Sequence, residues 1–367
     1  MDSLRRSLLK GLAGGATAGL LGGCGGTDAA QSPSPAPAPT PTRSWRMGFS
    51  PNPPRPDVAA VLQGIDLWSR RAELAILHED LPWADLLAGM SPDAILDRDK
   101  VALVRYLRDK GLSLAFMADL TDGLSRAEEA PALRKAGRSL AEPAVRQLYR
   151  DYVLAVERKL APEFLGLAAE TNLVRAAAPA SVYDAVVRAA NDAEVDLRAA
   201  AAASRRFISV QVETAWGVLG GGAAAYVGID RDLADFPFTS VLGLSSYPYF
   251  GYTQPEDIPA TYYSRLLAGR TLPALVTEGG WTSANVGTVQ SSPDLQARYI
   301  TRHAELLDSI NALALLQLQF ADIDLASLPP PVPANLPLFT AIGLADSHFA
   351  PKPALARWDA LFARPRR

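Results

Sequence analysis

The sequence contains few of the residues that disulfides, metal sites and nucleic-acid surfaces require. Its 367 residues include one cysteine and three histidines. A single cysteine excludes an intramolecular disulfide, and no His or Cys cluster has the spacing of a zinc site. The net charge of −3 shows no basic excess for binding nucleic acid. We therefore predict a protein without a metal, a cofactor or a nucleic-acid partner.

Two motifs of common enzyme classes are also missing. No Gly-x-Ser-x-Gly segment is present, which argues against an α/β-hydrolase. The first apolar segment with the character of a strand, Trp45–Ser50, is not followed by a glycine-rich phosphate loop. A Rossmann-type nucleotide site therefore has no support from the sequence.

The first 23 residues have the composition of an export signal. Residues 5–10, RRSLLK, resemble a twin-arginine signal, and the apolar stretch 11–23 is too short and small-sided to span a bilayer stably. Cys24 follows Leu-Gly-Gly, as in the lipobox where bacterial lipoproteins are cleaved and lipidated. A plain signal peptide with an incidental cysteine is the alternative. We predict a signal peptide over 1–23 and a protein held at the cell envelope by a lipid on Cys24.

Residues 24–44 are rich in Pro, Ala, Ser, Thr and Gly. Such a segment has little apolar surface to bury, and its prolines favour an extended conformation. We predict a semi-rigid linker over 24–44, followed by one folded domain over 45–367 that acts as a monomer.

Eight apolar segments of the domain have the character of buried strands, and helical patterns lie between them. Continuous apolar runs suit parallel strands that are covered on both faces. Eight such units in one run predict an α/β fold of the (β/α)8 TIM-barrel type, with an open doubly wound sheet as the alternative. The predicted strands are Trp45–Ser50, Glu73–His78, Ser113–Ala118, Phe164–Ala169, Phe207–Val212, Val241–Ser246, Ala274–Glu278 and Leu313–Phe320. The clearest predicted helices are Asp99–Lys110, Glu142–Lys159, Val182–Ala203 and Leu295–Ile310.

Two glutamates end apolar runs of this pattern. Glu170 follows the fourth predicted strand and Glu278 ends the seventh. In a TIM barrel the chemistry lies at the carboxyl ends of the strands, where two carboxyl groups can converge on one cleft. Acid/base cleavage of a glycosidic bond needs such a pair. Glu213, close to the end of the fifth strand, competes for either role.

Other polar and aromatic residues near the strand ends are candidates for binding a sugar. Planar side chains can lie against sugar faces, and amides or acids can bond hydroxyl groups. Each tryptophan is alternatively a loop anchor, and each histidine a satisfied structural residue. His303 lies in a helical pattern, which predicts a surface position. The candidates for substrate binding are His78, Glu79, Trp83, Asn172, Trp216, Tyr247, Tyr249, Trp281 and Gln319.

Three segments carry a resemblance to a known group of enzymes. Residues 243–249, GLSSYPY, and 276–281, VTEGGW, are similar to the strand-six and nucleophile segments of the family 53 endo-β-1,4-galactanases. Residues 343–354, followed by Trp358, resemble the closing segment of several families of clan A. With a glutamate after strand four and another on strand seven, the chain resembles the clan A glycoside hydrolases, which are retaining TIM-barrel enzymes.

The resemblance implies a role for each glutamate. Glu170 would be the general acid/base and Glu278 the nucleophile, acting on a β-linked poly- or oligosaccharide. Glu170 must then carry a proton near neutral pH, whereas Glu278 must stay ionised, with Tyr247 as its hydrogen-bond donor.

One position departs from the clan A pattern. These enzymes usually have an asparagine directly before the acid/base, where its amide bonds the sugar 2-hydroxyl, and this chain has Ala169 there. Asn172 could substitute for it. The departure supports a second hypothesis, a non-catalytic carbohydrate-binding lipoprotein with the same barrel. A solute-binding lipoprotein would need two lobes, and the single run of eight units speaks against it.

Overall fold

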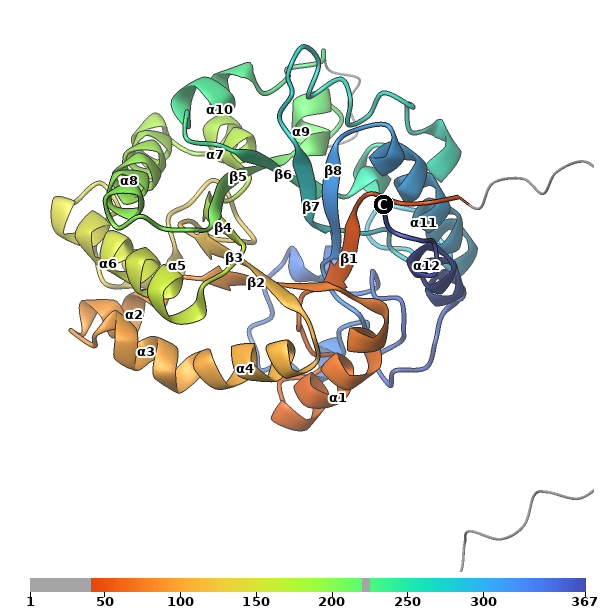
Figure 1. The fold of residues 1–367 in the computed structure, drawn as a ribbon, viewed down its shortest axis with the longest axis horizontal. Coiled ribbons are helices and arrows are strands. Elements are labelled where there is room, and N and C mark those ends of the chain that lie inside the picture. The colour runs from red at the N-terminus through yellow and green to blue at the C-terminus, as the bar shows by residue number, and fades with distance from the viewer. Residues whose placement is uncertain (1–40, 220–224) are drawn as a thin grey trace, which may run out of the picture. The chain divides into compact units, whose positions relative to one another are not determined.

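The domain is built around a closed sheet of eight parallel strands in chain order (Figure 1). The structure is a computed structural model that describes residues 41–219 and 225–367. β1 pairs with β8 and closes the sheet, which confirms the predicted TIM barrel and excludes the open sheet. The predicted signal peptide over 1–23, Cys24 and the linker up to residue 40 lie outside the described residues.

Every predicted strand overlaps an observed one. The largest difference is at the eighth strand, which ends at Gln317 rather than at the predicted Phe320. The strands are β1 (Arg46–Phe49), β2 (Leu74–Asp80), β3 (Ser113–Asp119), β4 (Phe164–Ala168), β5 (Arg205–Gln211), β6 (Val241–Ser246), β7 (Ala274–Gly279) and β8 (Ala312–Gln317).

Helices surround the barrel and cover the outward-facing side chains of its strands (Figure 1). Local signals start several of them: Asp57 accepts from the Ala60 N–H, and Ser292 from the Leu295 N–H, as capping residues. The helices are α1 (Val58–Trp68), α2 (Trp83–Leu87), α3 (Pro92–Asp99), α4 (Val101–Asp109), α5 (Pro131–Lys135), α6 (Pro143–Leu160), α7 (Thr171–Ala177), α8 (Ala180–Ala199), α9 (Val212–Trp216), α10 (Asp230–Asp235), α11 (Pro293–Asp308) and α12 (Pro353–Phe362).

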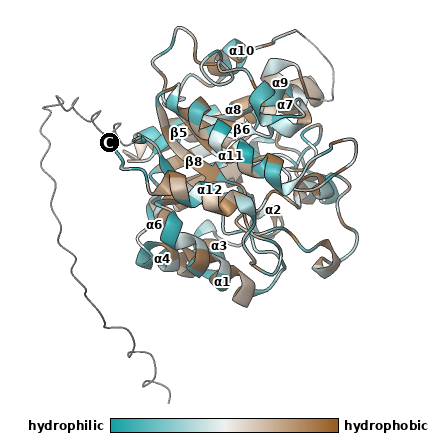
Figure 2. Cartoon of the chain, turned by 90° about the vertical axis from the view of Figure 1, so that its right-hand side faces the viewer, coloured by the Kyte–Doolittle hydropathy of each residue, from teal (hydrophilic) through white to brown (hydrophobic). Residues whose placement is uncertain are grey.

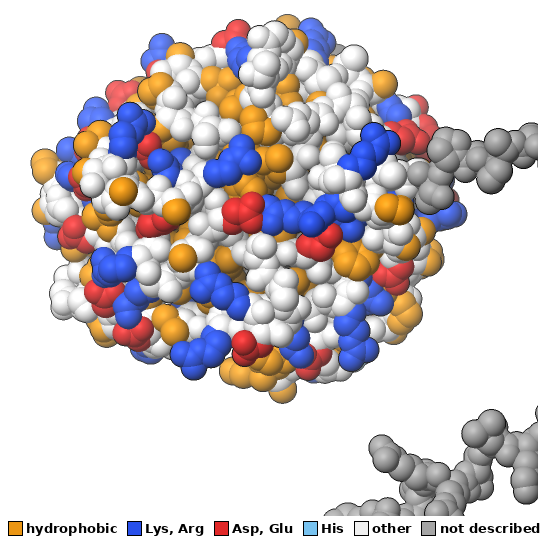
Figure 3. Space-filling model, viewed as in Figure 1, with side chains coloured by type: hydrophobic (Ala, Val, Ile, Leu, Met, Phe, Trp, Pro, Cys, Tyr) orange, Lys and Arg blue, Asp and Glu red, His pale blue; other side chains and the backbone are white. Residues whose placement is uncertain are grey.

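Two packed layers fill the domain. Side chains that point into the barrel, such as Leu74, Ile76, Met117 and Phe207, form one buried cluster, and a larger cluster lies between the strands and the helices. The strands are accordingly mostly hydrophobic in Figure 2, whereas hydrophilic residues lie on the helices. Charged groups of both signs are interspersed over the face seen in Figure 3.

The alternation of side chains along each strand determines which residues stand above this interior. Leu74 and Ile76 point into the barrel, so His78 and Asp80 follow on the same side of β2 at its carboxyl end. In the same way Asp119 follows Met117 on β3. At the carboxyl end of the barrel, the polar side chains of His78, Asp80 and Asp119 therefore lie directly above the apolar interior.

Arg43 ties the start of the described domain to its end. Its backbone N–H donates to the Pro365 carbonyl over 3.0 Å, and its guanidinium donates to the Glu73 carboxylate over 2.7 Å. Contacts with the barrel therefore begin at Arg43, within the stretch that the sequence assigns to the linker. None of the helices in residues 41–219 and 225–367 has the length and apolar character that crossing a membrane requires.

We expect two glycine-to-alanine changes to have opposite effects on stability. A Cβ at Gly48 would lie 1.7 Å from the Leu74 carbonyl oxygen, inside the β1–β2 pairing. Gly48→Ala should therefore lower the free energy of unfolding by roughly 1–3 kcal/mol or more, as overpacking does. In helix α1 a Cβ at Gly64 meets nothing closer than Phe349 at 3.5 Å. Gly64→Ala should be neutral or stabilising by up to about 1 kcal/mol. Urea unfolding measures both, and a stable Gly48→Ala protein would contradict the β1–β2 geometry.

Candidate active site

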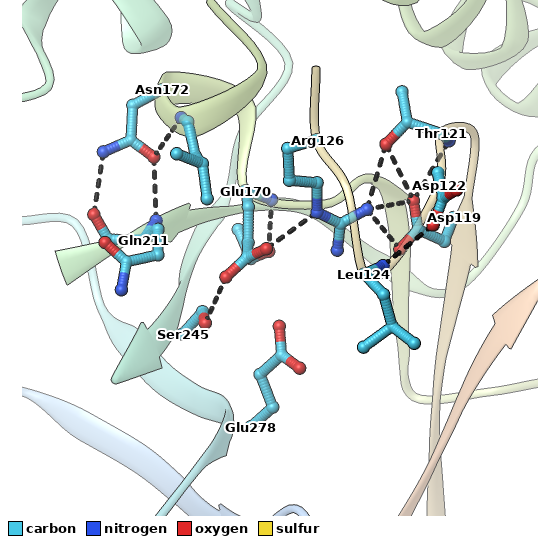
Figure 4. A network of polar contacts seen from close by, with 12 residues as sticks. Asp119, Thr121, Asp122, Leu124, Arg126, Glu170, Asn172, Gln211, Ser245 and Glu278 are labelled. Atoms are coloured by element: carbon cyan, nitrogen blue, oxygen red, sulfur yellow. Dashed lines mark hydrogen bonds and ion pairs between the residues drawn. The ribbon is translucent and has the colours of Figure 1, made fainter. Parts of the chain in front are cut away.

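Glu170 and Glu278 lie in one cleft at the carboxyl ends of the strands. A cavity of about 290 Å³ is lined by both glutamates and by His78, Asp119 and Tyr247. Figure 4 shows the two carboxyl groups pointing toward one another, with Ser245 beside them. The arrangement brings together residues from strands β2, β3, β4, β6 and β7.

Glu170 is held by three hydrogen bonds and an unusual backbone conformation. It has φ 45° and ψ 46°, in the left-handed region, and it starts helix α7. Its N–H donates to Ser209 Oγ over 2.9 Å. Its carboxylate accepts from Ser245 Oγ over 2.6 Å and from Arg126 Nε over 2.7 Å. Such a backbone conformation costs a non-glycine residue about 1–2 kcal/mol and is typical of functional positions.

Glu278 stands next to Ser245 in the pairing of β7 with β6. Ser245 therefore connects the two glutamates. It is the neighbour of Glu278 in the sheet, and its hydroxyl donates to Glu170. Tyr247 Oη donates to Glu278 Oε2 over 3.3 Å, and His78 Nδ1 lies 3.7 Å from the same oxygen. Glu278 Oε1 has no hydrogen-bond partner among the described residues. This oxygen is the freer of the two.

His78 places a positive charge beside Glu278. Its Nε2 lies 3.1 Å from Asp119 Oδ2. Burial disfavours the charged imidazolium, but the carboxylates of Glu278 and Asp119 outweigh this effect and raise the pKa of His78 to about 9. Burial raises the pKa of Glu278; the charge of His78 opposes that rise and the charge of Glu170 adds to it. At neutral pH the cleft therefore contains a charged imidazolium.

Arg126 joins Glu170 to Asp119. It comes from the loop after β3, and only 5% of its side chain is exposed. Nη1 donates to both Asp119 oxygens over 2.7 Å and to Thr121 over 2.9 Å, while Nε bonds Glu170. Burial opposes the charge of Asp119, yet Arg126 and His78 hold the pKa of Asp119 well below its usual range. Of the two glutamates, Glu170 has the stronger donors, and the predicted hydrogen bond from Tyr247 to Glu278 is present as well.

Glu213, the competing acid, does not line the cavity that contains Glu170 and Glu278. It is fully buried and accepts from Tyr262 Oη over 2.6 Å and from the Tyr247 N–H over 3.0 Å. Burial raises the pKa of Glu213 to about 7, although these hydrogen bonds oppose the rise. Its contacts position the segment that presents Tyr247, which is a supporting role.

Three of the predicted substrate-binding residues line the cleft. His78, Tyr247 and Gln319 contribute to the cavity that holds both glutamates. Gln319 Nε2 also donates to the Phe339 carbonyl over 3.0 Å, which fixes the loop above β8.

The other six predicted substrate-binding residues do not line this cavity, because their polar groups or rings make contacts inside the protein. Asn172 exchanges two hydrogen bonds of 2.8 Å with the Gln211 backbone, and Glu79 pairs with Lys100 at 2.5 Å. Four aromatic residues act as packing anchors. Trp83 is buried, Trp216 is stacked on Tyr262, Trp281 donates to Ser291, and Tyr249 donates to the Leu338 carbonyl.

Two further results differ from what the sequence predicts. His303 is 1% exposed and bonds Tyr263 Oη over 2.9 Å, so its predicted surface position is wrong. Asp80, Arg126 and Ser245 belong to the site but are not among the predicted site residues, although Ser245 lies in the GLSSYPY segment. Alternation along β2 and β6 could have suggested Asp80 and Ser245, whereas no local pattern indicates Arg126.

A second cavity adjoins the first. It has a volume of about 610 Å³ and shares Glu170, Arg126, Tyr247 and Phe339 with the smaller one. Its remaining lining is mostly aliphatic and comes from α7, from the end of β5 and from the segments after β3, α9, β6, β7 and β8. Glu170 therefore stands where a polar cavity meets an apolar one.

The side chains of the cleft are suited to moving a proton and holding charge. Paired carboxyl groups with a nearby imidazolium and guanidinium form a cluster of the kind found at catalytic sites. Within the part of the chain that the structure describes, no group of three or more His, Cys, Asp or Glu side chains could hold a metal ion.

Comparisons with known proteins find similarity in structure alone. Neither a scan of known protein families nor a search of curated proteins gives a match. An exo-β-1,4-mannosidase from Opitutaceae bacterium strain TAV5 matches with a TM-score of 0.65 at 16% identity, over 88% of this chain and 59% of its own. A GH5_18 protein from Streptomyces cattleya in complex with GlcNAc gives 0.61 and 18% over 89% and 83%. A GH5_18 variant from Bifidobacterium longum in complex with Manβ1-4GlcNAc gives 0.60 and 15% over 88% and 80%. These likenesses establish the TIM-barrel fold.

We expect His78 to give the protein a pH-dependent stability. Its pKa in the folded state is about 9, above the ordinary 6.5, so its contribution is complete below about pH 6.5 and is lost as the pH rises through about 9. The full shift corresponds to roughly 3 kcal/mol. In His78→Gln the free energy of unfolding should fall less over this interval than in the wild type.

His303→Gln is the matched control for this measurement. Burial lowers the pKa of His303 to about 3, so this residue stays neutral between pH 6.5 and 9. In His303→Gln, denaturant unfolding at several pH values should therefore show the same change in the free energy of unfolding with pH as in the wild type. An unchanged slope in His78→Gln would contradict the imidazolium assignment.

Proposed function

We propose that this protein is a retaining glycoside hydrolase of the clan A type that cleaves β-glycosidic bonds. Glu170 is the general acid/base and Glu278 is the nucleophile. One observation carries the proposal: glutamates from the ends of β4 and β7 of one barrel line the same cavity. The likeness to solved glycosidases of this fold supports it. The resemblance to family 53 galactanases suggests a poly- or oligosaccharide substrate.

In the first step Glu278 attacks the anomeric carbon while Glu170 gives a proton to the leaving oxygen. Glu278 must be ionised for this attack. The Tyr247 hydroxyl and the His78 imidazolium lie on Glu278 Oε2 and stabilise its charge. The partner-free Glu278 Oε1 is then the oxygen that forms the glycosyl bond. A retaining reaction needs the two carboxyl groups roughly 5–5.5 Å apart.

In the second step Glu170 acts as a base. It enters this step as a carboxylate because it has given its proton away, and it takes a proton from the attacking water. Arg126 and Ser245 bond this carboxylate. These contacts hold the carboxylate in place between the leaving oxygen and the attacking water.

The same contacts favour a second candidate function, sugar binding without turnover. Both carboxyl oxygens of Glu170 already accept hydrogen bonds within the protein, from Arg126 and from Ser245. In addition, Ala169 supplies no amide for the sugar 2-hydroxyl, and the amide of Asn172 is bonded to Gln211. A barrel with these features could keep a sugar site and lose efficient catalysis.

Substitution of each glutamate separates the two functions. We expect release of reducing ends from β-linked glycosides to fall by about a hundredfold or more in Glu170→Gln and Glu278→Gln. Azide should restore turnover in Glu170→Ala with a β-glycosyl azide product and in Glu278→Ala with the α product, since only a retaining enzyme divides the roles in this way. Glu305→Gln, on the outer surface of α11, is the matched control and should keep wild-type turnover. Sugar binding without turnover in the wild type, unchanged in both glutamate variants, would establish the second candidate instead.

We also propose that the domain is exported and acts as a monomer held at the cell envelope by a lipid on Cys24. The support is the lipobox pattern and the absence of any other cysteine in the chain. We expect Cys24→Ser to move the protein from the membrane pellet to the soluble fraction and to abolish labelling by a radioactive fatty acid. Thr27→Ala should behave as the wild type. A Cys24→Ser protein that still sediments with membranes would refute the anchor.

A further inference from the structure

The two cavities at Glu170 differ in part of their lining, while Leu124, Arg126, Tyr247 and Phe339 line both. The smaller one contains His78, Asp80, Asp119 and Glu278. The larger one has aliphatic and aromatic walls, formed chiefly by Leu124, Leu173, Phe250, Val289, Leu338 and Phe339.

The positions of the two glutamates indicate which cavity holds the sugar of a substrate and which holds its leaving group. Glu278 lines only the smaller cavity, whereas Glu170 lines both. The nucleophile attacks the sugar ring, and the acid must stand between that ring and the leaving group. This assignment rests on the proposed function. It puts the sugar in the smaller cavity and the leaving group in the larger one.

The polar side chains of the larger cavity are mostly engaged within the protein. Asn335 Nδ2 donates to the Leu124 carbonyl over 2.9 Å. Gln211 donates to Glu213 and accepts from the Thr214 N–H over 2.5 Å. A second sugar unit would bring several hydroxyl groups into this cavity, and hydroxyls that lose water without gaining partners weaken binding strongly.

Three aromatic rings form a continuous wall beside Glu170. Tyr247 lies 6.1 Å from Phe250 and 5.0 Å from Phe339, and those two phenylalanines are 5.9 Å apart, between ring centroids. Leu173 of α7 adds an aliphatic side chain to the same cavity. An apolar leaving group gains contacts from this wall and needs no hydrogen bonds from it.

We propose that the substrate is a β-glycoside of an apolar alcohol or phenol, in place of the poly- or oligosaccharide that the sequence resemblance suggests, with the alkyl or aryl group seated against Leu173, Val289 and the Phe250–Phe339 wall. The bond from the anomeric carbon to the leaving oxygen breaks as the bond to Glu278 forms. The Glu170 proton passes to that oxygen and releases the alcohol. Water then cleaves the glycosyl–Glu278 ester, returns a proton to Glu170 and yields the free sugar.

The test compares leaving groups on one sugar. Methyl, butyl, hexyl and phenyl β-glycosides of mannose, glucose, galactose and glucuronic acid are assayed with the full protein, beside β-1,4-linked disaccharides of the same sugars. We expect kcat/KM to rise roughly threefold to fourfold per buried methylene along the alkyl series. The hexyl or phenyl glycoside should be cleaved faster than the disaccharide. Comparing the hexyl with the phenyl glycoside then shows whether the cavity prefers an aliphatic or an aromatic leaving group.

Leu173→Asn keeps the size of the side chain and makes the wall polar. It should lower kcat/KM for the hexyl glycoside about tenfold and leave the methyl glycoside unchanged. Val58→Thr, on the exposed side of α1, is the control and should change neither.

The outcomes separate this inference from the proposed function. Turnover without a gain along the alkyl series, or with a preference for the disaccharide, would overturn the apolar leaving group and keep the glycosidase. If no glycoside is cleaved, the proposed function fails, and calorimetry with Glu278→Gln decides the inference: affinity must rise from methyl to hexyl and fall in the Leu173→Asn, Glu278→Gln double variant. Affinity that is independent of chain length would overturn it.

Discussion

The hydrogen bonds between β1 and β8 close the sheet, and the position of every residue in the cleft depends on this closure. A closed parallel barrel sends alternate side chains inward, where Leu74, Ile76 and Met117 belong to one buried apolar cluster. Polar residues on the same side of the strands then lie at the two ends of this packed interior, as Arg205 does at the amino end of β5 and Asp119 at the carboxyl end of β3. His78 and Asp119 are placed in the cleft by this rule, because each stands two residues beyond a core side chain.

Charge balance is the second constraint on the site. Four carboxyl groups line the smaller cavity, and two cations, His78 and Arg126, lie among them. Buried carboxylates are costly unless charged partners and hydrogen bonds compensate, and removing one partner exposes the full cost of the other. Asp119 forms an ion pair with both His78 and Arg126. The network therefore positions Glu170 and Glu278, which links the stability of the site to its chemistry.

Glu170 connects this polar network with the apolar cavity. Its strained left-handed backbone turns the chain from β4 into α7, so that its carboxylate reaches Ser245 and Arg126 while Leu173 faces the larger cavity. A proton donor at such a boundary can serve a reacting sugar on one side and an apolar leaving group on the other. The two chemical environments thus come from a single turn of the chain.

The sequence by itself determined the eight strands, their order and the location of Glu170 and Glu278 at strand ends, because apolar period and strand length are local properties. The tertiary structure alone decided which side chains meet there. Asn172 turns onto the Gln211 backbone and Trp281 packs inside, although their positions in the chain suggest the cleft. Arg126 reaches Glu170 across 44 positions through a loop whose path no local pattern specifies. Contacts of this kind depend on how distant segments pack once the barrel closes, and that packing is a property of the whole chain.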